Sequence, residues 1–317
     1  MKTLFAGAAL LLCMHALPAR ATFSIAACDA DGSCGVAVAT HNLAVGGSGV
    51  AWAQPRVGAV ASQFETNPHY GPEGLRLMAA GTSPEQALKR LLAADGDYDD
   101  TTVAERQVGL VDAQGRQAQY TGATALASSW AGASGGPGFS VQGNGLAGAA
   151  VLDAMRDAYL ASDKPLADRL LLALEAGEAA GGQRSGRMSA ALLVRTPEGG
   201  WRDTDLRVDS AAQPIAAMRV MFEQRQAHAA MIRAEQWVRQ GRKSDADAAL
   251  ARALSLAHGW DRIWARAARL AMARGDATRA REYLGVLRSI NPVMARMELE
   301  GERYVGLKGD PVVEGWR

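Results

Sequence analysis

The chain has 317 residues, of which 48% are hydrophobic and 21% charged, and this composition excludes a disordered or fibrous protein. Its 34 lysines and arginines are balanced by 33 acidic residues, which gives a formal net charge of +1. A net charge this close to zero gives no overall field to attract nucleic acid or an anionic membrane, so we expect neither as a partner.

The first 21 residues have the features of a secretory signal peptide. Lys2 gives a positive start, and the apolar run Leu4–Met14 is shorter than the roughly 20 residues that a membrane span needs. Small residues in Ala19–Ala21 occupy the positions that signal peptidase recognises, which predicts cleavage before Thr22. Cys13 leaves a lipoprotein site as an alternative. We expect an exported mature protein, periplasmic or extracellular, with no membrane span.

Cys28 and Cys34 are the two cysteines of the expected mature chain, and a turn-forming segment separates them. The flanking segments 23–27 and 35–40 have the character of strands, so the two cysteines can pair across a hairpin. Export favours a disulfide, and the alternative is two small apolar residues that stay reduced. A redox-active pair is disfavoured because the spacing is not Cys-x-x-Cys.

The sequence up to about residue 200 predicts alternating groups of strands and helices. Further strands are expected at 57–63, 108–112, 117–121, 139–142 and 189–195. Helices are expected at 72–80, 83–94, 149–162 and 165–176. Ser83 is a good N-cap for the second of them, because a proline follows it in the first helical turn. This order fits an α+β domain with helices on a mostly antiparallel sheet.

From about Pro214 onward the composition changes to Ala, Arg, Met and Leu with helical periodicity. Two segments align at an offset of 34 residues, with Gly241 matching Gly275. This spacing is the length of the tetratricopeptide (TPR) repeat, and it predicts an all-α, TPR-like region of two repeats and a capping helix. An ordinary pair of helical hairpins is the alternative. Two repeats are few for independent stability, so we expect packing on the first domain or self-association. The predicted divisions are 1–21, 22–223 and 224–317.

Thr22 is the residue on which the expected chemistry depends. Cleavage before it would leave a free α-amine on a residue that also carries a hydroxyl nucleophile. The reference pKa of an α-amine, about 7.7–8.0, suits proton acceptance near neutral pH, so one residue can both attack and activate. The alternative is a threonine that only begins the first strand, where such residues are common.

Several segments carry a resemblance to a known family, and they occur in order along residues 22–223. They are Thr22–Ala26, Gly35–Gly46, Val57–Gln63, Asn67–Leu75, Phe139–Asn144 and Gly177–Ala191. Together they resemble the family known as domain of unknown function 1028 (DUF1028), which is grouped with the N-terminal nucleophile (Ntn) hydrolases. The resemblance implies a four-layer αββα Ntn-hydrolase-like sandwich and, in an active member, hydrolysis of an amide bond. It implies no particular substrate.

The resemblance also bears on Thr22. In cytosolic relatives the equivalent threonine follows the initiator Met, so that removal of Met exposes it. Signal cleavage would expose Thr22 in the same way. A processing signal and a family start therefore both indicate Thr22 as the nucleophile.

Polar residues near the ends of expected strands are further candidates for the site. Candidates that line the site or donate to an oxyanion are His41, Gln63, Asn67, Gln142 and Asn144. His41 is placed there by the resemblance, and the alternative is a loop or core histidine. Ordinary turn chemistry is the alternative for the amides.

A glycine-rich turn before the strand at 189–195 supplies a second group of candidates. Arg184, Arg187 and Ser189 lie there, and a guanidinium in such a turn can bind a substrate carboxylate. Solvation of a loop explains Arg184 equally well. Relatives usually carry an acidic residue where this chain has Gln183, which argues against a carboxylate-assisted role at that point.

Metal and cofactor motifs are absent from the sequence. The five histidines show no ligand spacing, and Asp97–Asp100 falls short of a calcium-binding motif. The loop Gly46–Gly49 lacks the Lys-Ser or Lys-Thr that completes a phosphate-binding loop. We expect no metal and no cofactor.

Two functions from different classes remain. The first is an exported Ntn amidohydrolase in which Thr22 hydrolyses an amide or peptide bond of a small substrate. The second is a non-catalytic exported binding or scaffold protein, in which the TPR-like region 224–317 binds a protein partner or a second copy.

Overall fold

The structure, a computed structural model, describes residues 21–127 and 129–316; the expected signal peptide, apart from Ala21, and Cys13 lie outside the described residues. The chain forms two compact units, one ending at Ile215 and the other starting at Ala216. The boundary expected after residue 223 falls inside α6 (Pro214–Arg239), which is a continuous helix of 26 residues.

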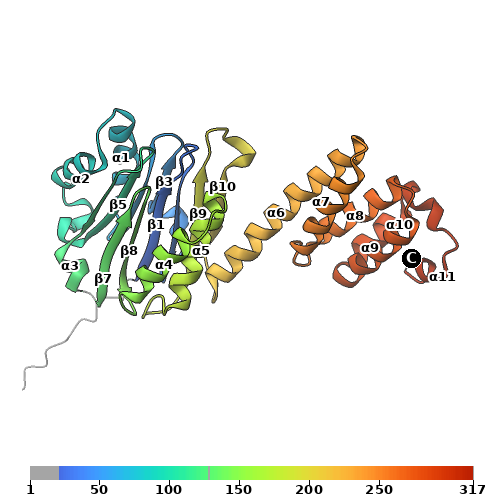
Figure 1. The fold of residues 1–317 in the computed structure, drawn as a ribbon. Helices are drawn as coiled ribbons and strands as arrows, with labels where there is room; N and C mark the ends of the chain where they lie inside the picture. Colours follow the sequence, from blue (N-terminus) through green and yellow to red (C-terminus); the bar gives the residue numbers. More distant parts are fainter. Residues whose placement is uncertain (1–20, 128, 317) are drawn as a thin grey trace, which may run out of the picture. The chain divides into compact units, whose positions relative to one another are not determined.

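The first unit contains two antiparallel sheets with the strand orders β10-β9-β2-β1-β8-β7 and β3-β4-β5-β6 (Figure 1). The larger sheet consists of β1 (Thr22–Cys28), β2 (Cys34–Thr40), β7 (Trp130–Gly136), β8 (Phe139–Leu146), β9 (Ser189–Arg195) and β10 (Thr204–Val208). The smaller sheet consists of β3 (Ala51–Gln54), β4 (Gly58–Phe64), β5 (Arg106–Asp112) and β6 (Gln117–Thr121).

Helices cover the outer face of each sheet. The α-helices of this unit are α1 (Tyr70–Ala79), α2 (Pro84–Ala93), α3 (Ala123–Ala127), α4 (Ala150–Leu160) and α5 (Leu166–Ala179). Short 3-10 helices are η1 (Val45–Gly47), η2 (Tyr98–Asp100), η3 (Val103–Glu105) and η4 (Gly200–Arg202). α1 and α2 pack on the smaller sheet, and α4 and α5 pack on the larger one (Figure 1). The unit is thus a four-layer αββα sandwich, which confirms the predicted α+β class.

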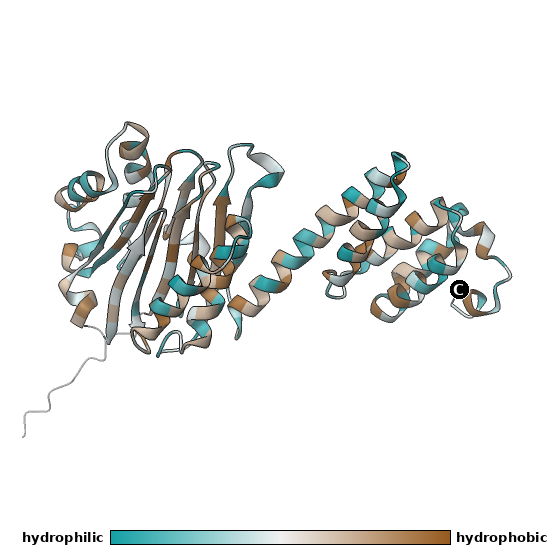
Figure 2. Ribbon diagram, in the orientation of Figure 1, coloured by the Kyte–Doolittle hydropathy of each residue, from teal (hydrophilic) through white to brown (hydrophobic). Residues whose placement is uncertain are grey.

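The central strand β1 is buried along its whole length because its alternate side chains enter two different layers. Phe23 faces α5, where Gly177 leaves room for its ring; a Cβ atom at Gly177 would lie 3.3 Å from a ring carbon. Ser24 faces the smaller sheet and donates to Gln63 on β4 at 2.7 Å. Figure 2 shows the apolar residues gathered on the strands, with hydrophilic residues along the helices.

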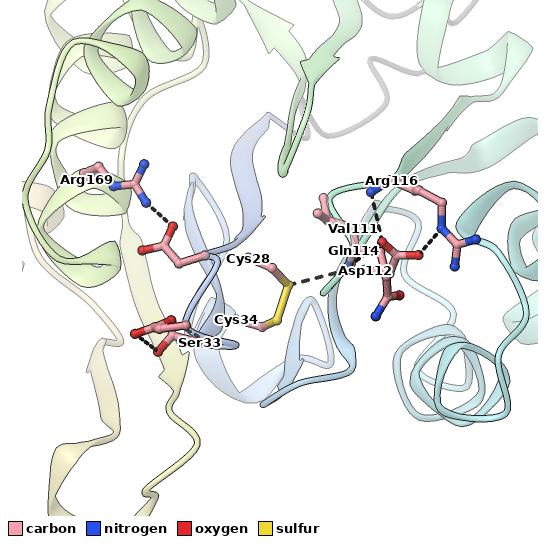
Figure 3. Close-up of a disulfide and its surroundings, with 10 residues drawn as sticks. Cys28, Ser33, Cys34, Val111, Asp112, Gln114, Arg116 and Arg169 are labelled. Carbon is pink, nitrogen blue, oxygen red and sulfur yellow. Dashed lines mark hydrogen bonds and ion pairs between the residues drawn. A yellow bond between two sulfur atoms is a disulfide. The ribbon is translucent and has the colours of Figure 1, made fainter.

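A disulfide joins Cys28 and Cys34 across the turn between β1 and β2, with the Cα atoms 4.1 Å apart (Figure 3). Sγ of Cys28 lies 3.9 Å from the carbonyl oxygen of Val111 on β5, so the bridge fills the space between the sheets. Closing so short a loop restricts the unfolded chain and contributes about 2 kcal/mol to stability. The two cysteines are partners in the ladder, and the same register pairs Thr22 with Thr40 at the other end of the hairpin.

A buried ion pair anchors the loop that follows α2. Arg106 on β5 binds Asp95 through Nε and Nη2, both at 2.9 Å, and both side chains are almost fully buried. Tyr70 and Asn67 also donate to the Asp95 carboxylate, at 2.5 and 3.2 Å. Burial by itself raises the pKa of the Asp95 carboxyl, but the hydrogen bonds from Arg106, Tyr70 and Asn67 outweigh it and hold the pKa below its usual value.

The second unit is mostly helical. Besides α6 it contains α7 (Lys243–Ser255), α8 (Asp261–Ala273), α9 (Ala277–Ile290), α10 (Pro292–Glu300), η5 (Glu302–Leu307) and α11 (Pro311–Glu314). The turns at Gly241 and Gly275 have φ angles of 72° and 75°, values that favour glycine. In each turn the N–H of the next residue, Arg242 or Asp276, donates at 2.9 Å to the carbonyl five residues earlier. The 34-residue spacing therefore recurs in the backbone.

Most expected elements are present, and Ser83 caps α2 by accepting the N–H of Gln86 at 3.3 Å. The sequence did not predict β3, β7 or β10. β7 has the sequence Trp-Ala-Gly-Ala-Ser-Gly-Gly, whose small residues have little strand propensity, and it forms by pairing with β8. These strands depend on neighbours that are distant in the sequence.

The Asp95 cluster predicts a pH-dependent stability. The folded-state pKa of Asp95 is below its usual value. The stabilisation that its carboxylate contributes is therefore fully present above about pH 4 and is lost as the pH falls below that. At pH 6, Asp95→Asn should lower the free energy of unfolding by about 3–5 kcal/mol, because it leaves Arg106 charged and buried. Urea unfolding should show this difference from the wild type shrinking toward pH 3.

The exposed loop substitution Asp97→Asn serves as the control, with an effect of at most about 0.5 kcal/mol at both pH values. A difference between wild type and Asp95→Asn that stays constant from pH 6 to pH 3 would contradict the assignment.

Candidate functional site

A row of polar side chains crosses the larger sheet at the start of β1. Thr22 is paired with Thr40 on β2 and with Asn144 on β8, and Thr40 is paired with Ser189 on β9. Directly opposed residues of an antiparallel ladder present their side chains to the same face. That face is the inner one, because Ser24, two residues along β1 from Thr22, binds a residue of the smaller sheet.

A second polar row, on the smaller sheet, meets the first. Gln63, Gln107 and Thr121 are partners across β4, β5 and β6. Oε1 of Gln107 accepts from Nε2 of Gln63 at 2.8 Å and from Nδ2 of Asn144 at 2.9 Å. Nε2 of Gln107 donates to the Gly143 carbonyl at 3.0 Å and to Thr121 Oγ1 at 3.1 Å. Gln107 therefore joins the two sheets just behind Thr22.

The Thr22 hydroxyl is oriented by Thr40. Oγ1 of Thr40 donates its single proton to the carbonyl oxygen of Ala21 at 2.9 Å, so it accepts from Thr22 Oγ1, which lies 2.9 Å away. The Asn42 N–H supplies a further donor at 3.3 Å. The His41 N–H also binds the Ala21 carbonyl, at 3.2 Å. Two donors thus hold the carbonyl of the residue that precedes Thr22.

Thr22 opens onto a cavity of about 300 Å³. Its walls are Thr22, Thr40, Gln63, the segment Phe64–Thr66, and the loop residues Asn42, Leu43, Val45, Ser48 and Val50. A cavity of this size accommodates a small ligand group. The hydroxyl of Thr22 is therefore ordered by a neighbour, and the residue lines a cavity.

Three buried polar atoms near this row have no hydrogen-bond partner among the described residues: Ser62 Oγ, Gln142 Oε1 and Asn144 Oδ1. Buried acceptors without partners are uncommon in folded proteins. Asn144 is directly across the ladder from Thr22, so its free oxygen belongs to the site. Gln142 is opposite Ser24, two residues further along the ladder, and its Nε2 donates to the Ala61 carbonyl at 3.0 Å.

Four of the candidates from the sequence lie around Thr22, in different roles. Gln63 lines the cavity, and Asn144 is in the polar row. Ser189 supports the cavity loop, because its Oγ donates to the Asn42 carbonyl at 2.6 Å and accepts the Val45 N–H at 3.1 Å. His41 contributes its main-chain N–H, and its imidazole does not line the cavity but lies near Gly186.

Three candidates, Asn67, Arg184 and Arg187, lie elsewhere. Asn67 is engaged by Asp95 and by the His69 N–H, so it supports the loop before β5 rather than the Thr22 cavity. Arg187 forms an ion pair with Glu178 on α5. Neither Arg187 nor Arg184 lines the cavity, so the structure places no guanidinium of that turn beside Thr22.

Sequence reasoning missed Thr40 and Gln107. Thr40 could have been predicted from the sequence, because a Cys28–Cys34 pair across a tight turn fixes the hairpin register and places Thr40 opposite Thr22. Gln107 gave no signal, because its role depends on how one sheet packs on the other.

Comparison with known proteins assigns the family. Residues 22–218, more than half of the chain, match the family described as "Family of unknown function (DUF1028)". The chain belongs to the DUF1028 family. A solved DUF1028 structure, protein SPO2555 from Silicibacter pomeroyi, is similar: it has 34% identity and a TM-score of 0.57, and the match covers 64% of this chain and 85% of that one. No curated protein matches.

Within the DUF1028 match, the first matched residue is Thr22. Across residues 21–127 and 129–316, no three His, Cys, Asp or Glu side chains are grouped so that they could hold a metal ion. No helix in the same ranges is long and apolar enough to cross a membrane.

The bridging role of Gln107 in this DUF1028 protein can be tested by Gln107→Leu. The change leaves several buried polar groups without partners, and each such group costs about 1–3 kcal/mol. We therefore expect the free energy of unfolding, measured in urea, to fall by at least about 3 kcal/mol from the wild-type value. Gln86→Leu, on the exposed face of α2, is the matched control and should change stability by at most about 0.5 kcal/mol. Equal effects of the two substitutions would contradict the bridging role.

Proposed function

We propose that this protein is an exported amidohydrolase of the Ntn type, with Thr22 as its nucleophile after removal of residues 1–21. The observation that carries the proposal is the placement of Thr22, whose Oγ1 is bound to Thr40 Oγ1 at 2.9 Å and which lines a cavity of about 300 Å³. The family match that begins at residue 22 supports it.

In the proposed reaction, the free α-amine of Thr22 accepts the proton of its own hydroxyl as Oγ1 attacks the carbonyl carbon of an amide. The C–N bond then breaks, and the leaving amine takes the proton from the α-ammonium group. The product at this stage is an ester on Thr22. Water attacks the ester, the α-amine again transfers the proton, and release of the carboxylic acid restores the hydroxyl.

Cleavage before Thr22 would also supply the oxyanion donors. In the described chain, Thr40 Oγ1 and the His41 N–H hold the carbonyl of Ala21 at 2.9 and 3.2 Å. Once Ala21 has left, both donors become available beside Thr22 Oγ1. A substrate carbonyl placed there would meet two donors where its negative charge develops.

Asn144 supplies an acceptor for the new amino terminus. Its Oδ1 is buried without a partner among the described residues, and the residue lies directly across the ladder from Thr22. Accepting a hydrogen bond from the α-amine would satisfy this oxygen and orient the amine toward Oγ1.

The second candidate is a non-catalytic exported binding protein that uses residues 224–317 to hold a protein partner or a second copy. The repeated turns at Gly241 and Gly275 favour it, because helical repeats of this kind form binding surfaces. A panel of electrophilic amide mimics separates the candidates: a covalent adduct on Thr22 supports the enzyme, and the absence of any adduct supports the binding protein.

The nucleophile is tested first. Sequencing of the secreted protein should show Thr22 as the first residue, and any other start removes the mechanism. Against a panel of acyl p-nitroanilides, Thr22→Ala should lose all turnover, whereas Thr22→Ser keeps the hydroxyl and the amine and should retain part of it. Full activity of Thr22→Ala would refute the role.

The oxyanion role of Thr40 predicts a loss of turnover without a comparable loss of binding. Thr40→Val removes the hydroxyl and keeps the shape, so kcat should fall by a factor of about 10²–10³ while KM changes little. Thr40→Ser, which retains the donor, is the matched control. An unchanged kcat in Thr40→Val would exclude this residue from the oxyanion site.

A further inference from the structure

A second cavity lies on the same face of the larger sheet as Thr22. It has a volume of about 590 Å³ and is bounded by the loop Gly46–Gly49, by Ala51–Ala53 of β3, and by residues of β9 and β10. Ser48 lines both this cavity and the one that contains Thr22. The two cavities are therefore neighbours.

The charged residues of this second cavity are Arg195, Arg207 and Asp205. Arg195 is neutralised inside the cavity, because its Nη2 binds Asp205 at 2.8 Å. Arg207 forms an ion pair with Asp209, which does not line the cavity, through contacts of 3.2–3.4 Å. The lining thus holds two arginines and one aspartate, and Arg207 is the arginine whose acidic partner lies outside the lining.

The glycine-rich loop gives Arg207 its position. A Cβ atom at Gly46 would lie 2.6 Å from Cγ of Arg207, and one at Gly47 would lie 2.7 Å from Nη2. Neither glycine has a positive φ angle, so the backbone alone does not require glycine at these two positions. The missing side chains instead leave the space in which the arginine lies.

Much of the remaining lining is apolar, and it includes Trp52 of β3, whose indole packs on α1. Nε1 of Trp52 donates to the Gly49 carbonyl at 2.8 Å, which holds the indole at the edge of β3. Gly71 on α1 leaves room for it, because a Cβ atom there would lie 2.0 Å from an indole carbon. A guanidinium in a cavity lined largely by glycines and by apolar residues such as Ala191 and Leu193 suits a group that is anionic at one end and apolar along its length.

We infer that the second cavity is a specificity subsite that binds a carboxylate of the substrate through Arg207, so that the preferred substrates are amides with a carboxylate beyond the scissile bond. The inference rests on the proposed function, because it takes the Thr22 cavity as the place of reaction. It also moves carboxylate recognition from Arg184 and Arg187, where the sequence suggested it, to the end of β10.

A binding measurement tests the subsite without requiring turnover. N-acetyl-alanyl-alanine and its carboxamide differ only in the terminal charge, and their affinities for the mature Thr22→Ala protein can be compared by calorimetry. We expect the carboxylate form to bind at least tenfold more tightly, the ratio that charged hydrogen bonds of about 1.5–3 kcal/mol imply. Equal affinities, or binding of neither peptide, would overturn the proposal.

Variants assign the preference to Arg207. Arg207→Met should abolish the difference between the two peptides, and Arg207→Lys should keep part of it. Gly47→Ala retains the arginine but would put a Cβ atom 2.7 Å from Nη2, which forces the guanidinium to move, so it should reduce the preference as well. Arg156→Met on α4, which lines neither cavity, should change nothing, and melting curves check that each variant is folded. A preference that survives Arg207→Met would refute the assignment.

The two proposals fail in different ways. If carboxylate binding depends on Arg207 but no amide is hydrolysed and no adduct forms on Thr22, the subsite stands and the amidohydrolase proposal falls. If Thr22 hydrolyses neutral and anionic amides equally well, the enzyme stands and the subsite falls.

Discussion

The register of β1 against its two neighbours is the constraint on which the site depends. The Cys28–Cys34 pair at one end of the β1–β2 hairpin leaves a single alignment, which brings Thr40 opposite Thr22 at the other end. A slip of one residue would send Thr22 and Ser24 toward the helices and would bring Phe23 between the sheets. The disulfide therefore matters for geometry as well as for stability, although it lies at the far end of the strand.

The space between the two sheets changes character along β1. Near the disulfide it is filled by small apolar residues, among them Ala26, Val36 and Ala59. At the Thr22 end it is filled by amides and hydroxyls that bind one another through Gln107. A buried polar layer of this kind is stable only when its members are satisfied, so it holds the side chains in fixed positions. Among the described residues, Asn144 Oδ1 is one of three atoms near this layer that have no partner, and it is the one that the proposed amino terminus would satisfy.

The loop between β2 and β3 lines both cavities. Ser189 holds its first part through the Asn42 carbonyl and the Val45 N–H, and its glycines accommodate Arg207. Ser48, between them, borders both spaces. Under the two proposals, this one loop would shape the place of reaction on one side and help to select the substrate on the other.

The sequence by itself determined the α+β class, most of the helices and strands and the 34-residue spacing of the helical unit, and it singled out Thr22 as the candidate nucleophile, because all of these depend on local patterns. β7 and β10 form only by pairing with neighbouring strands. The small residues of β7 favour no particular structure, and β10 is too short to be recognised from its own residues. Only the tertiary structure brought Gln107 behind Thr22 and Arg207 into a cavity beside it. Those two side chains come from segments far from Thr22 in the chain, and no local pattern records the packing of one sheet on another or the space that a distant glycine leaves.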